Sequence, residues 1–140
     1  MICRLALDTD VIVAGMRSPS GASAELLRRI RSGRAIMLAS VPLFVEYEAV
    51  TTRHEHVSGS GATRDEVENF LNIVAALVEP VETHFLWRPQ LRDADDEMIL
   101  EAAVNGRADG IVTFNARDYG ATSDEFGIET LPPAMILRRV

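Results

Sequence analysis

The chain has 140 residues, 47% of them hydrophobic and 25% charged, which is the size and composition of one ordinary domain spanning residues 1–140. Its single cysteine excludes an internal disulfide, and no charged-then-apolar leader is visible, so we expect a cytoplasmic protein. No apolar run approaches the roughly 18 to 20 residues that a spanning helix needs, so we expect a soluble protein with no membrane partner.

Acidic residues outnumber basic ones by 21 to 14, which gives a formal net charge of −7. This sign opposes binding of long nucleic acids by backbone neutralisation alone, so a polyanionic partner would require an additional cation. All 14 basic residues are arginine. The composition therefore excludes mechanisms that require lysine, such as a Schiff base or a P-loop.

Short apolar segments alternate with longer amphipathic ones along the chain. In order, the pattern predicts a strand at 3–7, helices at 11–17 and 22–31, a strand at 35–39, a helix to about 52, a loop at 52–62, a helix to about 77, a weak strand within 78–91, a helix at 93–105, strands at 109–113 and 127–131, and a helix at 132–138. This alternation predicts a three-layer α/β/α fold with a central, mainly parallel sheet.

Capping residues in the sequence predict where several helices begin and end. Ser40 and Asp93 are predicted N-caps, Gly106 is a predicted C-cap, and Thr63 with Glu66 has the spacing of a capping box. Because open parallel sheets place their sites at the carboxyl ends of strands, the polar residues at these ends are the candidates for a functional site.

Two carboxylates occupy positions where burial makes a charge costly. Asp8 follows the first apolar strand, although a turn aspartate that caps the next helix is the alternative interpretation. Glu46 lies three residues after Leu43 and four before Val50, on the apolar stripe of its helix, where a side chain that extends out to solvent is the alternative.

A third carboxylate continues another buried stripe. Asp96 stands three residues before Ile99 and seven before Ala103. Any acid in a first turn is favoured by the helix dipole, which is the alternative explanation, but Asp93 is the more natural cap.

The last polar group is Thr113, Asn115 and Asp118, which follow the strand at 109–113. We expect these residues, Asp8, Glu46 and Asp96 to gather at one edge of the sheet. Crowded carboxylates repel one another unless a cation neutralises them, and oxygen ligands favour Mg²⁺ or Mn²⁺. Such a site suits phosphodiester hydrolysis. Two such cations would also reduce the net charge to about −3.

Four segments resemble the acidic motifs of PIN-domain ribonucleases, in order and over nearly the whole chain: LDTDVIVAG, VPLFVEYEAV, RDADDEMILEAA and ADGIVTFNARDYG. The closest resemblance is to the VapC-like toxins of bacterial toxin–antitoxin systems. It implies a metal-dependent endoribonuclease with an RNA substrate and a cognate antitoxin protein. Asp8, Glu46 and Asp96 match the first three acids of the family, and Thr113 matches its strand-end hydroxyl.

Two positions depart from the family pattern. Asp10 stands where the family usually has asparagine, and Asn115 stands where it usually has an acid. Asp118 could supply the missing carboxylate. We therefore predict Asp8, Glu46, Asp96 and Asp118 as catalytic residues and Asp8, Asp96, Asn115 and Asp118 as metal ligands, with Asp10 and Thr113 in supporting roles.

Two other functions remain open. Residues 8–12 nearly spell the nucleophile motif of haloacid-dehalogenase-type phosphatases, but that family usually carries a lysine beside its carboxylates. The chain could also be a weak or silent PIN-like module that acts through protein contacts. The apolar helices at 22–31 and 63–77 could then bind an antitoxin or form a homodimer.

Most other polar side chains need no functional explanation. Solvation is the default interpretation for His54 and His56, which lack the spacing of a helical metal pair. It is also the default for four arginines that could rim the site and contact phosphates, namely Arg17, Arg88, Arg92 and Arg117.

Overall fold

The computed structural model describes residues 2–53, 61–84, 93–120 and 125–140. Its strands are β1 (Cys3–Leu7), β2 (Ala35–Ala39), β3 (Val78–Pro80), β4 (Gly110–Val112) and β5 (Glu129–Leu131). Its helices are α1 (Thr9–Arg17), α2 (Ala22–Arg31), α3 (Val41–Thr51), α5 (Arg64–Leu77), α6 (Ala94–Asn105) and α8 (Pro133–Ile136), and a 3₁₀ turn, η1, covers Ala116–Asp118.

The five strands form one sheet in the order β3-β2-β1-β4-β5, and every neighbouring pair is parallel. The chain builds outward from β1 through β2 to β3 and then returns to place β4 on the other side of β1. The order of strands therefore reverses between β1 and β4. In open α/β sheets, ligands bind beyond the carboxyl ends of the strands at such a reversal.

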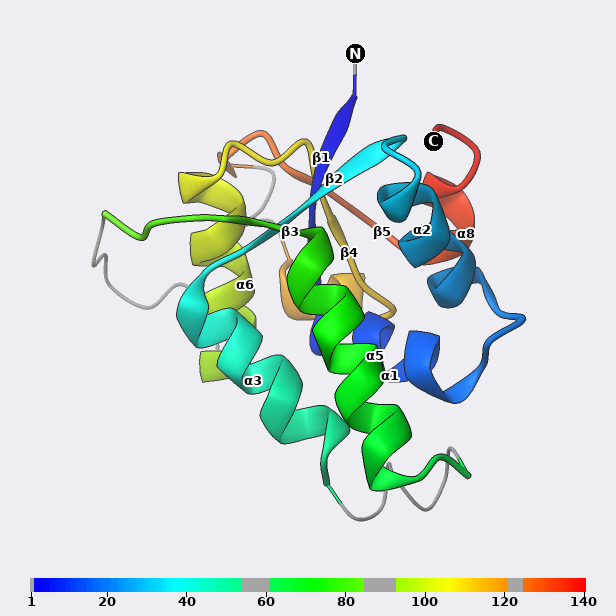
Figure 1. Ribbon diagram of the computed structural model, residues 1–140. Helices are drawn as coiled ribbons and strands as arrows, with labels where there is room; N and C mark the ends of the chain where they lie inside the picture. The colour runs from blue at the N-terminus through cyan, green and yellow to red at the C-terminus, as the bar shows by residue number, and fades with distance from the viewer. Residues whose placement is uncertain (1, 54–60, 85–92, 121–124) are drawn as a thin grey trace.

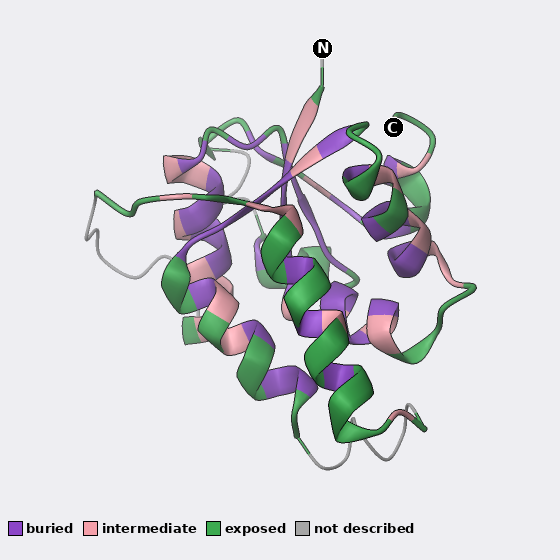
Figure 2. Cartoon of the chain, in the orientation of Figure 1, coloured by how far each residue is buried: buried purple, intermediate pink, exposed green. Residues whose placement is uncertain are grey.

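Helices cover both faces of the sheet. Helix α6 packs on β1, β2 and β4, whereas α2 packs on β2 and contacts α8. Figure 1 shows α6 on one side of the strands and α2 and α8 on the other, with α3 and α5 side by side. The central strands β1, β2 and β4 are largely buried, and the helices turn their exposed residues outward (Figure 2). The predicted three-layer α/β/α fold is confirmed.

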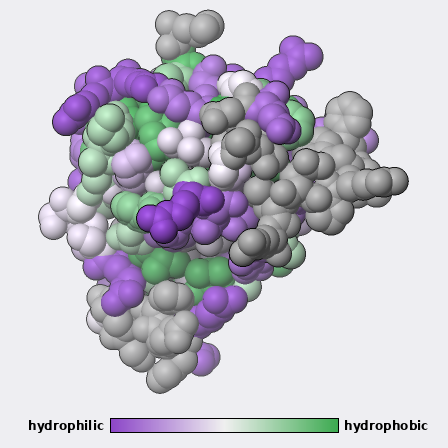
Figure 3. All heavy atoms as spheres, turned by 180° about the vertical axis from the view of Figure 1, so that it is seen from behind, coloured by the Kyte–Doolittle hydropathy of each residue, from purple (hydrophilic) through white to green (hydrophobic). Residues whose placement is uncertain are grey.

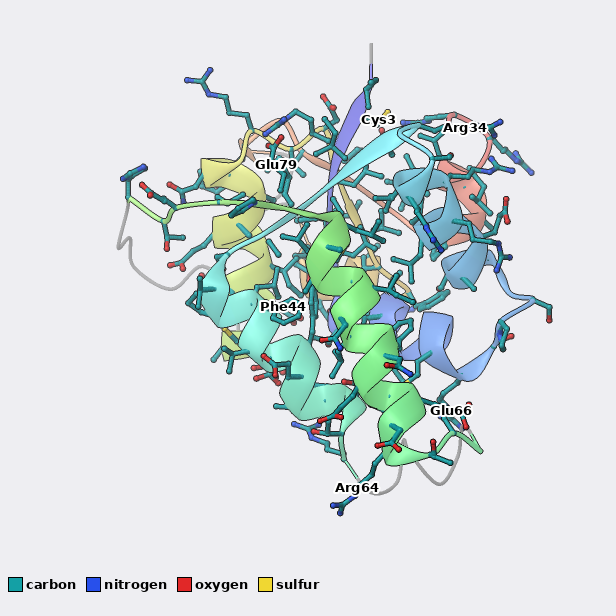
Figure 4. All side chains as sticks on the ribbon, viewed as in Figure 1. Cys3, Arg34, Phe44, Arg64, Glu66 and Glu79 are labelled. Carbon is teal, nitrogen blue, oxygen red and sulfur yellow. The ribbon has the colours of Figure 1, made fainter. Side chains whose placement is uncertain are left out.

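Local capping explains where several helices begin. The side chains of Ser40 and Asp93 accept backbone N–H groups at the starts of α3 and α6, as predicted. Thr63 and Glu66 form both hydrogen bonds of the capping box ahead of α5. Figure 4 places Glu66 in the first turn of that helix. The predicted C-cap at Gly106 is also confirmed.

Other predicted boundaries were wrong by one or two residues. Helix α1 begins at Thr9 rather than at residue 11, because the side chain of Asp8 accepts the Thr9 N–H and caps the helix before its apolar stripe starts. The last two strands and the last helix are shorter than predicted. β4 and β5 pair over only three residues. The predicted weak strand reduces to β3, and residues 85–91 lie outside the described part of the chain.

Both chain ends lie at the same end of the molecule (Figure 1). Among the described residues, no helix is long and apolar enough to cross a membrane.

A buried tyrosine ties α3 to the end of β1. Tyr47 has no exposed surface, and its hydroxyl donates a hydrogen bond to the backbone carbonyl of Leu7. Its ring also packs edge-on against Phe44, with ring centroids 6.2 Å apart. This hydrogen bond fixes the backbone immediately before Asp8.

We predict that Tyr47→Phe lowers the free energy of unfolding by about 1–3 kcal/mol, because the buried Leu7 carbonyl loses a donor. Urea denaturation followed by circular dichroism measures the change. Ile73→Val is a suitable control, since Ile73 lies on an exposed face of α5. An unchanged midpoint in Tyr47→Phe would show that this hydrogen bond does not stabilise the junction.

Candidate active site

Asp8 lies at the junction of β1 and α1, beside the end of β4. The register pairs Leu7 with Val112, and the backbone N–H of Asp8 donates to the Val112 carbonyl at 2.9 Å. The residues that directly follow the two strands, Asp8 and Thr113, therefore lie side by side. Their positions follow from the parallel pairing at the reversal of strand order.

The carboxylate of Asp8 is only 5% exposed and is held by groups from three segments. Its Oδ1 accepts the backbone N–H of Thr9 at 2.7 Å. Its Oδ2 accepts the Thr113 hydroxyl at 2.7 Å and the Tyr119 hydroxyl at 3.2 Å. These donors compensate the desolvation of the carboxylate and fix its orientation.

Two tyrosines near Asp8, Tyr47 and Tyr119, were not predicted as site residues from the sequence. Burial, and then the negative charge of Asp8, raise the pKa of both Tyr47 and Tyr119, so their hydroxyls remain protonated donors at neutral pH. Tyr47 lies on the same apolar stripe of α3 that drew attention to Glu46, so helical periodicity could have indicated its burial. Nothing local distinguishes Tyr119 from an ordinary core aromatic.

Asp10 connects α1 to the segment after β4. Its Oδ2 accepts the backbone N–H of Phe114 at 3.1 Å and the side-chain amide of Asn115 at 2.9 Å. Its Oδ1 is buried and has no hydrogen-bond partner among the described residues. Burial, followed by the charge of Asp8, raises the pKa of Asp10 to about 6.

Asp96 stands half-buried in the first turn of α6. Burial, and then the negative charges of Asp8, Asp93, Asp118 and Asp95 in that order of effect, together raise its pKa to about 7. Asp96 therefore lies within electrostatic reach of Asp8, at the end of β1, and of Asp118, in η1. Asp118 itself is exposed. These acids come from separate parts of the chain, as the predicted convergence requires.

Glu46 is half-buried on α3, as its stripe position predicted, with 18% of its side chain exposed. Its Oε1 lies 3.9 Å from Nη2 of Arg53. No hydrogen bond or ion pair among the described residues joins Glu46 to Asp8 or Asp96. Hydrogen bonds do join four of the other predicted site residues, namely Asp8, Thr113, Asn115 and Asp10.

The donor set of this site fits a hard divalent cation. No three acidic, histidine or cysteine side chains in the described ranges stand in the arrangement of a formed metal site. However, Asp10 has a buried oxygen with no hydrogen-bond partner among the described residues. The pKa values of Asp10 and Asp96 are raised first by burial and then by the negative charge of Asp8. Carboxylate and amide oxygens are ligands that Mg²⁺ and Mn²⁺ prefer. A bound cation would relieve the repulsion.

The structure describes two of the four arginines that could rim the site. Arg17, at the end of α1, and Arg117, in η1, are exposed. Arg88 and Arg92 lie outside the described residues, as do His54 and His56.

Residues 4–117 match the family described as PIN domain. The chain belongs to the PIN domain family. PIN domains are generally metal-dependent nucleases, hydrolases that act on RNA. The matched range covers the site residues from Asp8 to Asn115, and Asp118 lies one position beyond it. A search of curated proteins found no match. PIN membership favours nuclease chemistry over the phosphatase alternative.

We predict that Asp96→Asn raises the melting temperature of the metal-free protein more at pH 8 than at pH 5. The ordinary pKa of 3.8 for this carboxyl is raised to about 7 in the folded protein. The protonated carboxyl therefore stabilises the fold fully below about pH 4, and this stability is lost as the pH rises through 7. Asparagine cannot ionise and avoids that loss. Thermal melts in EDTA at the two pH values measure the difference.

The matched control is Asp65→Asn, which removes an exposed first-turn acid from α5. A fall in melting temperature at both pH values for Asp96→Asn would instead assign Asp96 a helix-stabilising role through the dipole.

Proposed function

We propose that the protein is a cytoplasmic, single-domain endoribonuclease that depends on Mg²⁺ or Mn²⁺ and serves as the VapC-like toxin of a toxin–antitoxin pair. The observation that carries the proposal is the electrostatic coupling of Asp8, Asp10, Asp96 and Asp118 beside the strand-order reversal. Acids from the β1–α1 junction, α6 and η1 have little structural reason to share one neighbourhood unless a cation joins them.

In this proposal, Asp8 and Asp96 are the main ligands, and Asn115 and Asp118 complete the set. Glu46 holds the cation or its water, a role supported by its half-buried position on α3. The described ion pair with Arg53 competes with that role.

Phosphodiester hydrolysis needs an activated water and stabilisation of the leaving oxygen, which bound divalent cations supply. Water oxygen bonds to phosphorus and the phosphorus–oxygen ester bond breaks, leaving a phosphate monoester and a hydroxyl. Hydrogen bonds within the chain orient the carboxylates of the site. Thr113 and Tyr119 hold the carboxylate of Asp8, while Asn115 and the Phe114 N–H hold that of Asp10.

A hydrophobic cleft supports the proposed protein partner, an antitoxin or a second copy. It has a volume of about 290 Å³ and lies between α1, α2 and α5. Leu27, Phe70 and Leu77 contribute apolar walls, and Ile73 is 48% exposed there. Both helices predicted to carry a partner surface thus border this cleft.

One observation favours the alternative of a weak or silent nuclease. Asn115 replaces the acid that the resemblance predicts, and its amide donates to Asp10 instead of adding negative charge. The cleavage assay below separates the two functions.

We predict that the protein cleaves single-stranded RNA in Mg²⁺ and that EDTA abolishes cleavage. Asp8→Ala and Asp96→Ala should each lower the rate by more than about 100-fold, because a ligand to the cation is lost. Gel analysis of an end-labelled RNA measures the rate, and circular dichroism verifies that each variant is folded.

Asp65→Asn is the control here too and should keep the wild-type rate. Cleavage that persists in folded Asp8→Ala or Asp96→Ala would contradict the assigned roles. A folded wild-type protein that cleaves no RNA in Mg²⁺ or Mn²⁺ would favour the silent module.

A further inference from the structure

A second cleft opens directly beside the candidate active site. It has a volume of about 370 Å³, within the range of small-ligand sites. Its lining comes from α1, the end of α3 and the segment after β4: Thr9, Asp10, Val13, Ala14, Arg17, Val50 and Phe114. One of the coupled carboxylates, that of Asp10, therefore forms part of its wall.

The α1 wall of this cleft is a single helical stripe. Asp10, Val13, Ala14 and Arg17 are spaced at positions i, i+3, i+4 and i+7. The stripe places a carboxylate at one end and a guanidinium about 10 Å further along the helix axis, with small apolar side chains between them. Arg17 is exposed, so its guanidinium is accessible to a ligand.

Phe114 borders the same cleft and is 52% exposed. Its backbone is held in place because its N–H donates to Asp10 at 3.1 Å. Single exposed hydrophobic residues are common, and small hydrophobic groups appear among hydrophilic ones on the rear face (Figure 3). Among the exposed large hydrophobic side chains of the described residues, Phe114 alone lines the cleft that contains Asp10.

We propose that this cleft binds one nucleotide of single-stranded RNA next to the phosphate that is cleaved. The base stacks on the ring of Phe114 and contacts the apolar stripe of α1, and Arg17 pairs with a phosphate at the far end. The inference rests on the proposed function, because it takes the acids beside the cleft as the cleavage site.

The chemistry of the cleft suits this ligand. An aromatic ring binds the face of any base without reading its sequence, and a guanidinium pairs with phosphate oxygens. Bases in a duplex are already stacked on their neighbours, whereas unpaired bases are free to enter a cleft. The cleft therefore selects single strands and supplies a local positive group in a protein of net charge −7.

The test compares two probes at one ionic strength: an eight-nucleotide oligoadenylate, and an abasic ribose-phosphate chain of the same length. Binding is measured by fluorescence anisotropy in Ca²⁺, which fills oxygen sites. Phe114→Ala should weaken oligoadenylate binding by about 5- to 150-fold and leave abasic binding unchanged. Phe114→Tyr should retain the preference for oligoadenylate. Arg17→Met should weaken both probes.

Two controls match these substitutions. Met135→Ala truncates another exposed hydrophobic side chain, and Arg138→Met removes another exposed arginine, both outside the cleft. Neither should alter binding of either probe. In cleavage assays, Phe114→Ala should raise KM by the same factor and change kcat by less than about twofold, which a general loss of folding would not do.

The outcomes separate this inference from the proposed function. Equal binding of the two probes by the wild type, or unchanged oligoadenylate binding in Phe114→Ala, overturns the nucleotide cleft even if RNA is cleaved. Loss of the preference in Phe114→Ala supports the cleft even if no cleavage is seen, and the nuclease proposal then fails alone. If Phe114→Ala loses binding to an antitoxin protein but binds RNA as the wild type does, Phe114 belongs to a protein interface. This result also overturns the inference.

Discussion

Asp8 holds a carboxylate almost out of water at the end of a buried parallel strand, and burial of a charge is costly unless hydrogen bonds compensate it. The compensation comes from Thr9 at the start of α1, Thr113 after β4 and Tyr119 after η1. These donors converge because β1 and β4 are parallel neighbours whose carboxyl ends lie at the same edge. The position of this one carboxylate thus links the topology of the sheet to the chemistry at its edge.

The hydrogen bonds that satisfy Asp8 do not remove its charge, and the charge acts on its neighbours. Burial, and then the charge of Asp8, raise the pKa values of both Asp10 and Asp96, so both ionise less readily than usual. A fold that keeps such carboxylates close is electrostatically strained without a cation and relaxed with one. The same cation gives an acidic protein a way to hold the phosphates of RNA, which its net charge would otherwise repel.

Local signals predicted much of this fold because caps and apolar periodicity act over a few residues. The capping box at Thr63 and the N-cap at Asp93 are examples, and Asp8 and Asp96 were indicated because a carboxylate on an apolar pattern needs an explanation. The partners of these acids were harder to predict. The hydrogen bond from Tyr119 to Asp8 joins residues 111 positions apart, and only the strand order brings them together. Glu46 satisfied its stripe pattern, but its proximity to Arg53 depends on rotamers that no pattern specifies.

The central claim is that these acids share a divalent cation, and locating the ion tests it most directly. Crystals soaked in Mn²⁺ would reveal bound metal by its anomalous scattering. The account predicts a peak about 2.0–2.3 Å from carboxylate oxygens of both Asp8 and Asp96. A peak confined to the outer acids Asp93 and Asp95, or no peak in crystals where Asp8 and Asp96 are free of lattice contacts, would contradict it.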